Sequence, residues 1–357
     1  MKKVLFFMAA IAMIFISCSE DANEIPQQET NIDMSDFYVY TDADIDEGSR
    51  SANGKSKSCY SMVNLNRLLN ANPGLEKKMY DIEYNTRKHI AGKKPDGVGG
   101  GNGGGNNGGG DDGGGDPPVD DGLGTINIPV YVHVVYSNSQ ENISDSQINS
   151  QMAVLNDDFR RTNNDANQTP SEFSGVATDS EIEFTLAGTF RHSDSRTSWG
   201  TNDAVKSAYP PVTPATHLNI WVCNIGGNIL GYAQFPGGPA ATDGVVVSPQ
   251  YFGTTGTATA PFDGGRTTTH EVGHYLNLRH IWGDGRCNRD DFVSDTPRSD
   301  RPNYGCPSSA YHCRSNDQFM NYMDYTNDDC MNMFSQGQKE RMRALFASGG
   351  ARESILP

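Results

Sequence analysis

The chain has 357 residues, with 44 acidic against 28 basic side chains and a net charge of −16. This balance argues against a nucleic-acid-binding protein, whose sequence signature is a basic face. Glycine is over-represented at 39 residues, and 15 of these lie between Gly97 and Gly124. Because such a cluster is typical of a flexible linker, we expect a linker at 95–124 and one domain with a substantial core at 125–357.

The N-terminus has the pattern of an export signal, because Met1-Lys2-Lys3 precede an apolar run from Val4 to Ile16. That run is too short to cross a membrane as a helix. Cys18 follows a small residue, Ser17, and this arrangement resembles the processing site of bacterial lipoproteins. We therefore predict a signal peptide at 1–17 and a lipid anchor on Cys18, at the outer membrane or cell surface. The alternative is an ordinary signal peptide with a coincidental cysteine.

The two segments between Cys18 and the linker have opposite charge. Residues 18–50 hold ten acidic residues and one basic residue, and so polar a segment is predicted to be a disordered tether. Residues 51–94 hold nine basic and three acidic residues, with apolar side chains at broadly helical intervals from Asn64 to Ile90. We predict one or two short helices there, interrupted at Pro73-Gly74.

The domain at 125–357 alternates strand-like and helix-like segments. A helix is predicted from about Ser144 to Arg161, with Ser144 as a possible N-cap. The nearly continuous apolar run from Ile126 to Tyr136 is typical of a strand buried on both faces. Further strands are predicted at Ile182–Phe190, His217–Cys223, Gly231–Phe235 and Gly244–Val247. This order predicts an α/β (α+β) domain with a mixed sheet.

The candidate chemistry lies at His270-Glu271-Val272-Gly273-His274, followed by His280. On a helix, His270 and His274 project from one face and can reach one ion, while Glu271 is suited to hold a water. A catalytic zinc needs three protein ligands, and His280 can be the third if the chain turns back after Leu276. Asn277 stands at that turn, and asparagine tolerates the left-handed backbone conformation well. The alternatives are a chance match and a structural zinc, which usually has four ligands and favours cysteine.

A second motif follows downstream, at Asn321-Tyr322-Met323-Asp324-Tyr325. It resembles the Met-turn of metzincin proteases, in which a methionine forms an apolar floor beneath the zinc histidines. Met323 is the candidate for that floor, and Tyr325 is a candidate hydrogen-bond donor to a tetrahedral intermediate. The alternatives are a methionine that only fills the core and a buried aromatic residue.

From Thr125 to about Ala347 the chain resembles the pappalysin family of metzincins, in its bacterial and archaeal branch. The resemblance implies a secreted zinc endopeptidase with a mixed sheet and two long helices above a horizontal cleft and an irregular lower subdomain below it. Five stretches carry it: Ile128–Tyr136, Leu155–Arg161, Leu230–Pro236, the zinc segment continuing to Asp284, and Met323–Tyr325 with Cys330–Phe334.

The resemblance also implies roles for residues around the cleft. Gly231, Tyr232 and Ala233 match an edge strand that would pair with an extended peptide substrate, although an ordinary edge strand has the same pattern. The order of the last four cysteines matches two family disulfides, Cys287–Cys313 and Cys306–Cys330. Four cysteines allow three pairings, so spacing alone does not decide between them.

Two further sites are implied by the resemblance. Asp291 and Thr296 match ligands of a calcium-binding loop, and the alternative is a solvated acidic loop. Asp328 and Asp329 match an acid at the base of the S1′ pocket, which would favour Arg or Lys just after the scissile bond. Of these two acids we choose Asp329.

Residues 51–94 then fit a propeptide. Cys59 lies where some relatives have a cysteine that occupies the open zinc position, and a thiolate is a good zinc ligand. The alternatives are a disulfide with Cys223 and an inert thiol. Residues 51–94 carry a net charge of +6 against −9 for 125–357, and opposite charges favour docking of the two parts.

Together these features predict a latent, exported zinc endopeptidase in which Glu271 is the general base. Its cofactors are one catalytic Zn²⁺ and a structural Ca²⁺. Its expected partners are protein or peptide substrates, its own propeptide and, only through Cys18, a membrane; we expect a monomer that does not bind nucleic acid. One rival is a zinc-binding surface lipoprotein without activity, and another is a metalloenzyme that acts on a different substrate class.

Overall fold

The computed structural model describes residues 31–42, 59–93 and 120–357 of the chain. The predicted signal peptide, the predicted anchor Cys18 and most of the glycine-rich segment lie outside the described residues. From Ile32 onward the described residues belong to one structural unit. In this described part of the chain, no helix is both long and apolar enough to cross a lipid bilayer.

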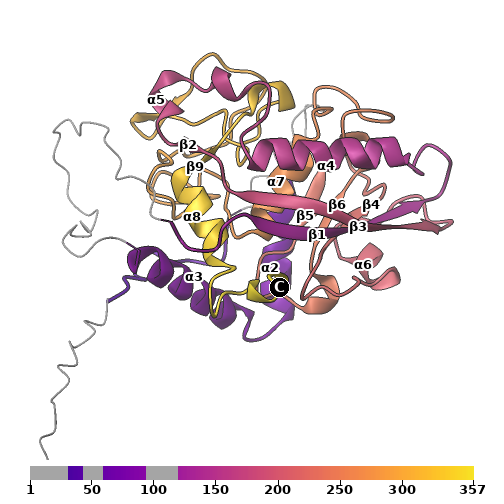
Figure 1. Cartoon of the computed structure of the whole chain (residues 1–357), viewed down its shortest axis with the longest axis horizontal. Helices are drawn as coiled ribbons and strands as arrows, with labels where there is room; N and C mark the ends of the chain where they lie inside the picture. Colours follow the sequence, from indigo (N-terminus) through magenta and orange to yellow (C-terminus); the bar gives the residue numbers. More distant parts are fainter. Residues whose placement is uncertain (1–30, 43–58, 94–119) are drawn as a thin grey trace, which may run out of the picture. The chain divides into compact units, whose positions relative to one another are not determined.

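The elements are labelled in chain order, and the main ones are marked in Figure 1. The helices are α2 (Ser61–Ala71), α3 (Leu75–Ala91), α4 (Asp145–Phe159), α5 (Ser171–Ser174), α6 (Ala204–Ala208), α7 (Arg266–Tyr275) and α8 (Gln336–Ala344). The strands are β1 (Ile126–Tyr136), β2 (Ala177–Thr178), β3 (Ile182–Ser193), β4 (Leu218–Val222), β5 (Gly231–Ala233), β6 (Val245–Val247), β7 (Tyr311–His312), β8 (Ser315–Asn316) and β9 (Phe334–Ser335). Short 3₁₀ turns are η2 (Ala166–Gln168), η3 (Ala240–Thr242), η4 (Pro249–Tyr251), η5 (Asp328–Cys330) and η6 (Glu353–Ile355).

A five-stranded sheet with the order β3-β1-β4-β6-β5 organises the domain. Neighbouring strands are parallel except at one edge, where β5 runs antiparallel to β6. The sheet is therefore mixed, and the predicted α/β fold class is confirmed. The antiparallel edge strand β5 is the element that borders the candidate site.

Both faces of the sheet are covered, which explains the nearly continuous apolar sequence of β1. Val130 of β1, Leu155 of α4 and Val272 of α7 share the main hydrophobic core. On the opposite face, Val135 of β1 packs with Val205 of α6 in a separate cluster. In Figure 1, α4 and α6 accordingly lie on opposite sides of the strands.

The predicted element boundaries agree with the structure to within a few residues. The Ser144 hydroxyl accepts a hydrogen bond from the Gln147 backbone N–H, so Ser144 is the N-cap of α4. β3 continues to Ser193, beyond the predicted end at Phe190, while β5 ends at Ala233 and not at Phe235.

Below the sheet, the segment between α7 and α8 contains little regular structure. Disulfides Cys287–Cys313 and Cys306–Cys330 cross-link it, in the pairing that the family resemblance implies. Each closes a loop of intermediate length, and such cross-links typically contribute about 2–4 kcal/mol to stability. They hold a segment that has too few backbone hydrogen bonds to be rigid by itself.

The segment before the linker packs against the domain. α2 and α3 are separated near Pro73-Gly74, as predicted, and Leu65, Met79 and Phe235 share one hydrophobic cluster. Val39 also belongs to that cluster. Residues 32–42 therefore differ from the predicted disordered tether, because four consecutive apolar or aromatic side chains at 37–40 give this short stretch a surface to bury.

The two ends of the linker lie side by side. Lys93, at the end of α3, is 3.4 Å from the Asp121 carboxylate. Asp121 in turn accepts two hydrogen bonds of 2.6 Å from the buried Arg343 guanidinium of α8. The start of the domain is thus held in place by Arg343, independently of the residues between 94 and 119.

Candidate active site

The helix α7 presents His270 and His274 on one buried face. The helix ends at Tyr275, and Asn277 adopts φ +70° in the turn that follows. The Leu278 N–H donates to the Gly273 carbonyl at 2.9 Å and closes this turn. The chain is thereby redirected so that His280 returns to the two helical histidines, as the sequence predicts.

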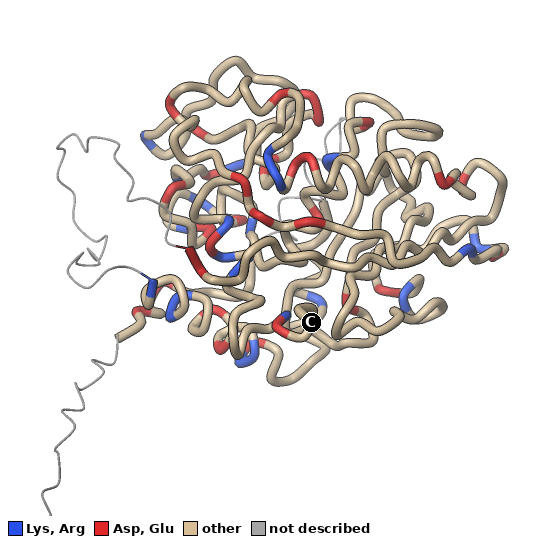
Figure 2. The backbone as a smooth tube through the Cα atoms, in the orientation of Figure 1, with Lys and Arg blue, Asp and Glu red and all other residues tan. Residues whose placement is uncertain are grey.

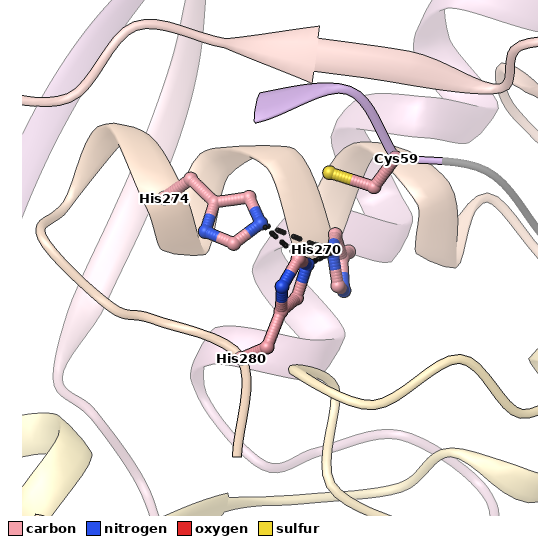
Figure 3. Close-up of side chains that lie close together, drawn as sticks. All are labelled: Cys59, His270, His274 and His280. Atoms are coloured by element: carbon pink, nitrogen blue, oxygen red, sulfur yellow. Dashed lines mark hydrogen bonds between the residues drawn. The ribbon is translucent and has the colours of Figure 1, made fainter. Parts of the chain in front are cut away.

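The three imidazoles converge through their Nε2 atoms. The Nε2 of His270 lies 3.3 Å from that of His280, and the Nε2 of His274 lies 3.2 Å from each of the other two. A tetrahedral zinc ion with Zn–N bonds of about 2.0–2.1 Å requires ligand nitrogens about 3.3 Å apart. The three residues therefore have the spacing of one zinc site (Figure 3).

The opposite ring nitrogens fix the direction of each histidine. His270 Nδ1 lies 2.7 Å from the Tyr322 carbonyl and His274 Nδ1 lies 2.8 Å from the Leu278 carbonyl. His280 Nδ1 lies 2.5 Å from Asp284 Oδ1. Such acceptors hold the proton on Nδ1 and leave Nε2 to bind a metal. Asp284 was not predicted from the sequence, although a carboxylate four residues after a candidate ligand is a signal that could have identified it.

Met323 lies beneath the zinc helix and is fully buried. A Cβ atom added to Gly273 would come within 2.4 Å of the Met323 sulfur. Glycine at this helix position therefore allows the Met-turn to approach the histidines, which is where the sequence motif places Met323.

Asp158 of α4 joins three elements around this floor and was missed by sequence reasoning. Its carboxylate accepts hydrogen bonds of 2.8 Å from the Thr269 hydroxyl of α7 and from the Tyr322 hydroxyl of the Met-turn. Burial raises the pKa of Asp158 to about 6, although the nearby Arg266 opposes this shift. Asp158 therefore connects α4 to α7 and to Tyr322, whose carbonyl orients His270.

Glu271 is buried beside the histidines, where it meets Cys59 and Ser61. Its Oε2 accepts a hydrogen bond of 2.7 Å from the Ser61 hydroxyl, and the Cys59 Sγ lies 3.4 Å from the same oxygen. A Cβ atom at Gly231 would come within 2.9 Å of the Glu271 Cγ. Glycine at the start of β5 therefore gives this glutamate its place under the edge strand.

The propeptide lies along the edge strand β5. The Tyr60 N–H donates to the Gly231 carbonyl at 3.1 Å, and the Ala233 N–H donates to the Ser61 hydroxyl at 2.7 Å. Cys59 forms a parallel bridge with Gly231. Residues 59–61 thus occupy main-chain groups that are expected to pair with a peptide substrate, whereas the Tyr232 side chain is buried in the cluster on the opposite face.

Cys59 brings a sulfur to the histidines. Its Sγ and the ligand nitrogens of His270, His274 and His280 all lie within 4.8 Å of one another, and Figure 3 shows the sulfur directed toward the three rings. The Tyr325 hydroxyl donates to the Cys59 carbonyl at 3.3 Å. Within the described residues, Cys59 and Cys223 are not joined to each other, so the alternative Cys59–Cys223 disulfide is not formed.

The predicted calcium residues lie together in the loop after the zinc segment. The Thr296 hydroxyl contacts both Asp291 carboxylate oxygens, at 2.8 and 2.9 Å, and lies 2.8 Å from the Val293 carbonyl. Burial, with the neighbouring Asp290 charge, raises the pKa of Asp291 well above its usual range. A buried carboxylate surrounded by other oxygen atoms is a donor set that suits Ca²⁺.

The two candidate S1′ acids occupy different environments. Asp329 is exposed, whereas Asp328 is buried. Asp328 Oδ2 accepts backbone hydrogen bonds from Gly264 at 2.9 Å and from Arg266 at 3.1 Å, at the start of α7. An anion in this position also interacts favourably with the helix N-terminus.

Known proteins match both the sequence and this geometry. The Peptidase_M43 family model, described as pregnancy-associated plasma protein-A, matches residues 213–347. Extracellular metalloprotease 1 of Coccidioides posadasii (strain C735) is 34% identical over 234 residues, which cover 62% of this chain and 77% of the relative. The chain belongs to the pappalysin family. The resemblance inferred from sequence is thereby confirmed, and the chain is a zinc metalloendopeptidase with a metzincin-type fold.

Two solved structures support the same conclusion. Mature mirolysin of Tannerella forsythia, in complex with a cleaved peptide, has a TM-score of 0.63 and 47% identity; the match covers 65% of this chain and 95% of mirolysin. A promirolysin mutant from the same organism has a TM-score of 0.70 and 39% identity, and the match covers 84% of this chain and 97% of that one. The match to promirolysin covers more of this chain than the match to mature mirolysin does. This difference agrees with a propeptide in this chain.

We predict that Asp284→Asn lowers zinc affinity by about 10- to 100-fold, because the variant loses the charged acceptor that orients His280. Competition with a chromogenic chelator measures this affinity. Asp300→Asn, which alters a partly exposed acid paired with Arg301, is the control. Equal zinc affinity in the Asp284 variant and the control would contradict the orienting role.

Proposed function

We propose that His270, His274 and His280 hold the catalytic zinc and that Glu271 is the general base of peptide hydrolysis. The observation that carries this proposal is the 3.2–3.3 Å spacing of the three Nε2 atoms, with Glu271 buried beside them. Zinc, when bound, supplies Lewis acidity and lowers the pKa of a bound water. All three histidines and the general base Glu271 are present. A zinc-binding lipoprotein without activity would be expected to lack one of these residues.

The remaining steps belong to side chains and backbone groups of this chain. The β5 edge, through Gly231 and Ala233, holds the substrate backbone by main-chain hydrogen bonds. Glu271 accepts a proton from the attacking water and returns it to the leaving amine. The Tyr325 hydroxyl, which reaches the Cys59 carbonyl in the zymogen, donates a hydrogen bond to the oxygen that becomes negative in the transition state.

We predict that Glu271→Gln retains zinc and loses peptide hydrolysis by at least about 10³-fold, since the amide cannot accept the proton. Activated enzyme and the variant are each incubated with a denatured protein mixture, and the new termini are mapped by mass spectrometry while bound zinc is measured. Cleavage by a zinc-loaded Glu271→Gln variant at the wild-type rate would remove Glu271 from this role.

The same map of cleavage sites tests a preference for Arg or Lys at P1′, the position just after the scissile bond. We propose this preference because the family resemblance implies an acid at the base of the S1′ pocket. Our choice from sequence is Asp329, and its exposure suits an acid that remains available to a substrate side chain. Asp329→Asn should reduce the share of cuts before Arg or Lys, whereas Asp328→Asn should mainly affect stability because Asp328 caps α7. The opposite pattern would assign the pocket to Asp328.

We further propose that Cys59 keeps the zymogen latent. Its sulfur approaches the three histidines, the Ser61 hydroxyl occupies Glu271, and the backbone around Tyr60 occupies the β5 edge. A cysteine thiolate is a strong zinc ligand, so it would displace the water that hydrolysis requires. Three requirements of catalysis are thus blocked by residues 59–61.

We predict that Cys59→Ala raises the activity of the uncleaved zymogen toward a short peptide by at least about tenfold, because the open zinc position becomes available to water. The activity should stay below that of the processed enzyme, since the Ser61 and β5 contacts remain. The matched control is Cys223→Ala, which removes a buried thiol on the far face of the sheet. Activity that rises equally in both variants, or in neither, would contradict a specific role for Cys59.

We also propose a structural Ca²⁺ held by Asp291 and Thr296. A bound cation would offset the cost of burying the Asp291 carboxylate and lower its raised pKa. We predict that calcium raises the melting temperature of the full chain and that Asp291→Asn abolishes this increase. An unchanged calcium response in the variant would place the ion elsewhere. Asp300→Asn is again the control.

Finally, we propose that Cys18 anchors the zymogen and that cleavage near Lys93-Lys94 begins its release. Because buried ion pairs such as Glu83–Arg341 join the two parts, one cut should leave the domain bound to its propeptide. We predict that linker-cleaved protein sediments with membranes until the propeptide is degraded. Fractionation with immunoblotting tests this, and immediate release after one cut would contradict it. Loss of sedimentation in Cys18→Ser tests the anchor.

A further inference from the structure

Residues 32–42 and α3 together cover a second surface, apart from the histidines, that the latency mechanism does not use. We call it the arginine surface and define it by Arg279, Arg289, Arg341 and Phe292. Figure 2 colours the Lys and Arg residues of the described chain blue and the Asp and Glu residues red. Tyr38 lies at its centre, with Arg279 4.5 Å and Arg289 4.1 Å from the tyrosine ring centroid.

Tyr38 is recognised through both its ring and its backbone. The Arg279 Nη2 donates to the Tyr38 carbonyl at 2.7 Å, and the Phe292 ring packs edge-on against the Tyr38 ring at 5.2 Å. The Tyr38 hydroxyl donates to the Gly283 carbonyl at 2.5 Å and the Asp290 carbonyl at 2.8 Å. Burial raises the pKa of this hydroxyl to about 12, so it remains a donor at neutral pH.

An acidic residue completes the contact. Glu83 of α3 accepts hydrogen bonds of 3.0 and 2.7 Å from the Arg341 guanidinium, and both side chains are buried. Burial opposes ionisation of Glu83, but Arg341 and Arg87 outweigh it and lower the pKa of Glu83 to about 2. The carboxylate is therefore charged throughout the physiological range.

The acceptors described for these arginines come mostly from residues that precede the linker. Removal of the propeptide would leave the Arg279 and Arg289 guanidiniums without Tyr38, and Arg341 without Glu83, although Arg341 keeps the Phe292 carbonyl at 3.2 Å. The arginines would then form a basic, partly aromatic surface on a domain whose net charge is −9. Such a surface attracts acidic segments and stacks with aromatic rings.

We propose that the arginine surface of the activated enzyme is an exosite for protein substrates, and that its occupant is an extended segment with an aromatic residue and a nearby acid. The inference rests on the proposed peptidase function, which it extends to substrate choice. Tyr38 and Cys59 use different partners, since Cys59 contacts Gly231 and the histidines. A segment bound at the arginine surface therefore leaves the β5 edge open.

The first experiment measures binding of a fluorescently labelled peptide with the sequence of residues 32–42 to enzyme activated from the full chain. Fluorescence anisotropy should show saturable binding, at least about tenfold weaker for a Tyr38→Ala peptide and for the Arg289→Ala enzyme, which is the loss of about 1.4 kcal/mol. Arg301→Ala removes an exposed arginine paired with Asp300 and should bind as wild type. Absent binding, or equal weakening by both arginine variants, would overturn the proposal.

The second experiment joins the same segment, or a scrambled copy, to a cleavable reporter through a flexible spacer. The intact segment should lower KM by about tenfold without changing kcat, and Arg289→Ala should abolish this gain while cleavage of a short peptide is unchanged. Equal KM values for the two reporters would refute the exosite. Cleavage of the short peptide reports the peptidase function separately, so failure of one proposal is distinguishable from failure of the other.

Discussion

The active site depends on three imidazoles whose Nε2 atoms face one point. Their orientation is fixed by hydrogen-bond acceptors for the opposite ring nitrogens, the Nδ1 atoms. Two of the acceptors are backbone carbonyls, of Tyr322 and Leu278, and the third is the Asp284 carboxylate. Each acceptor requires a different structural element: the Met-turn, the turn at Asn277 and the loop after His280. Packing that positions these elements, such as Met323 against Gly273, therefore also determines the geometry of the metal site.

Latency uses the same groups that catalysis needs. The backbone around Tyr60 pairs with the β5 edge, Ser61 occupies Glu271, and Cys59 faces the histidines. A second set of contacts, through Tyr38 and Glu83, lies away from the histidines and consists of cation–π contacts and a buried ion pair. Because these contacts do not involve the linker, we expect them to persist when only the linker is cut.

The local features of the fold were predictable from sequence, whereas the links between distant segments were not. Periodicity and spacing predict β1, α4 and the histidine helix, and Asn277 predicts the turn that brings back His280. Asp158 carries no local signal, because its partners Thr269 and Tyr322 come from other elements. Asp284 was missed although it lies only four residues after its partner His280. The packing of residues 32–42 was missed because the ten acidic residues in 18–50 dominate the average composition of that segment. Val39, which is buried, and its partly buried neighbours Phe37 and Tyr38 pack against the rest of the protein.

We propose that the Cys59 sulfur binds the active-site zinc in the zymogen and leaves it on activation. Zinc K-edge X-ray absorption measured on the full-length zymogen and on the activated enzyme tests this most directly. The account predicts one sulfur scatterer at about 2.3 Å together with imidazole nitrogens in the zymogen, and only nitrogen and oxygen ligands after activation. A zymogen spectrum without sulfur, or a sulfur ligand retained in the active enzyme, would contradict it.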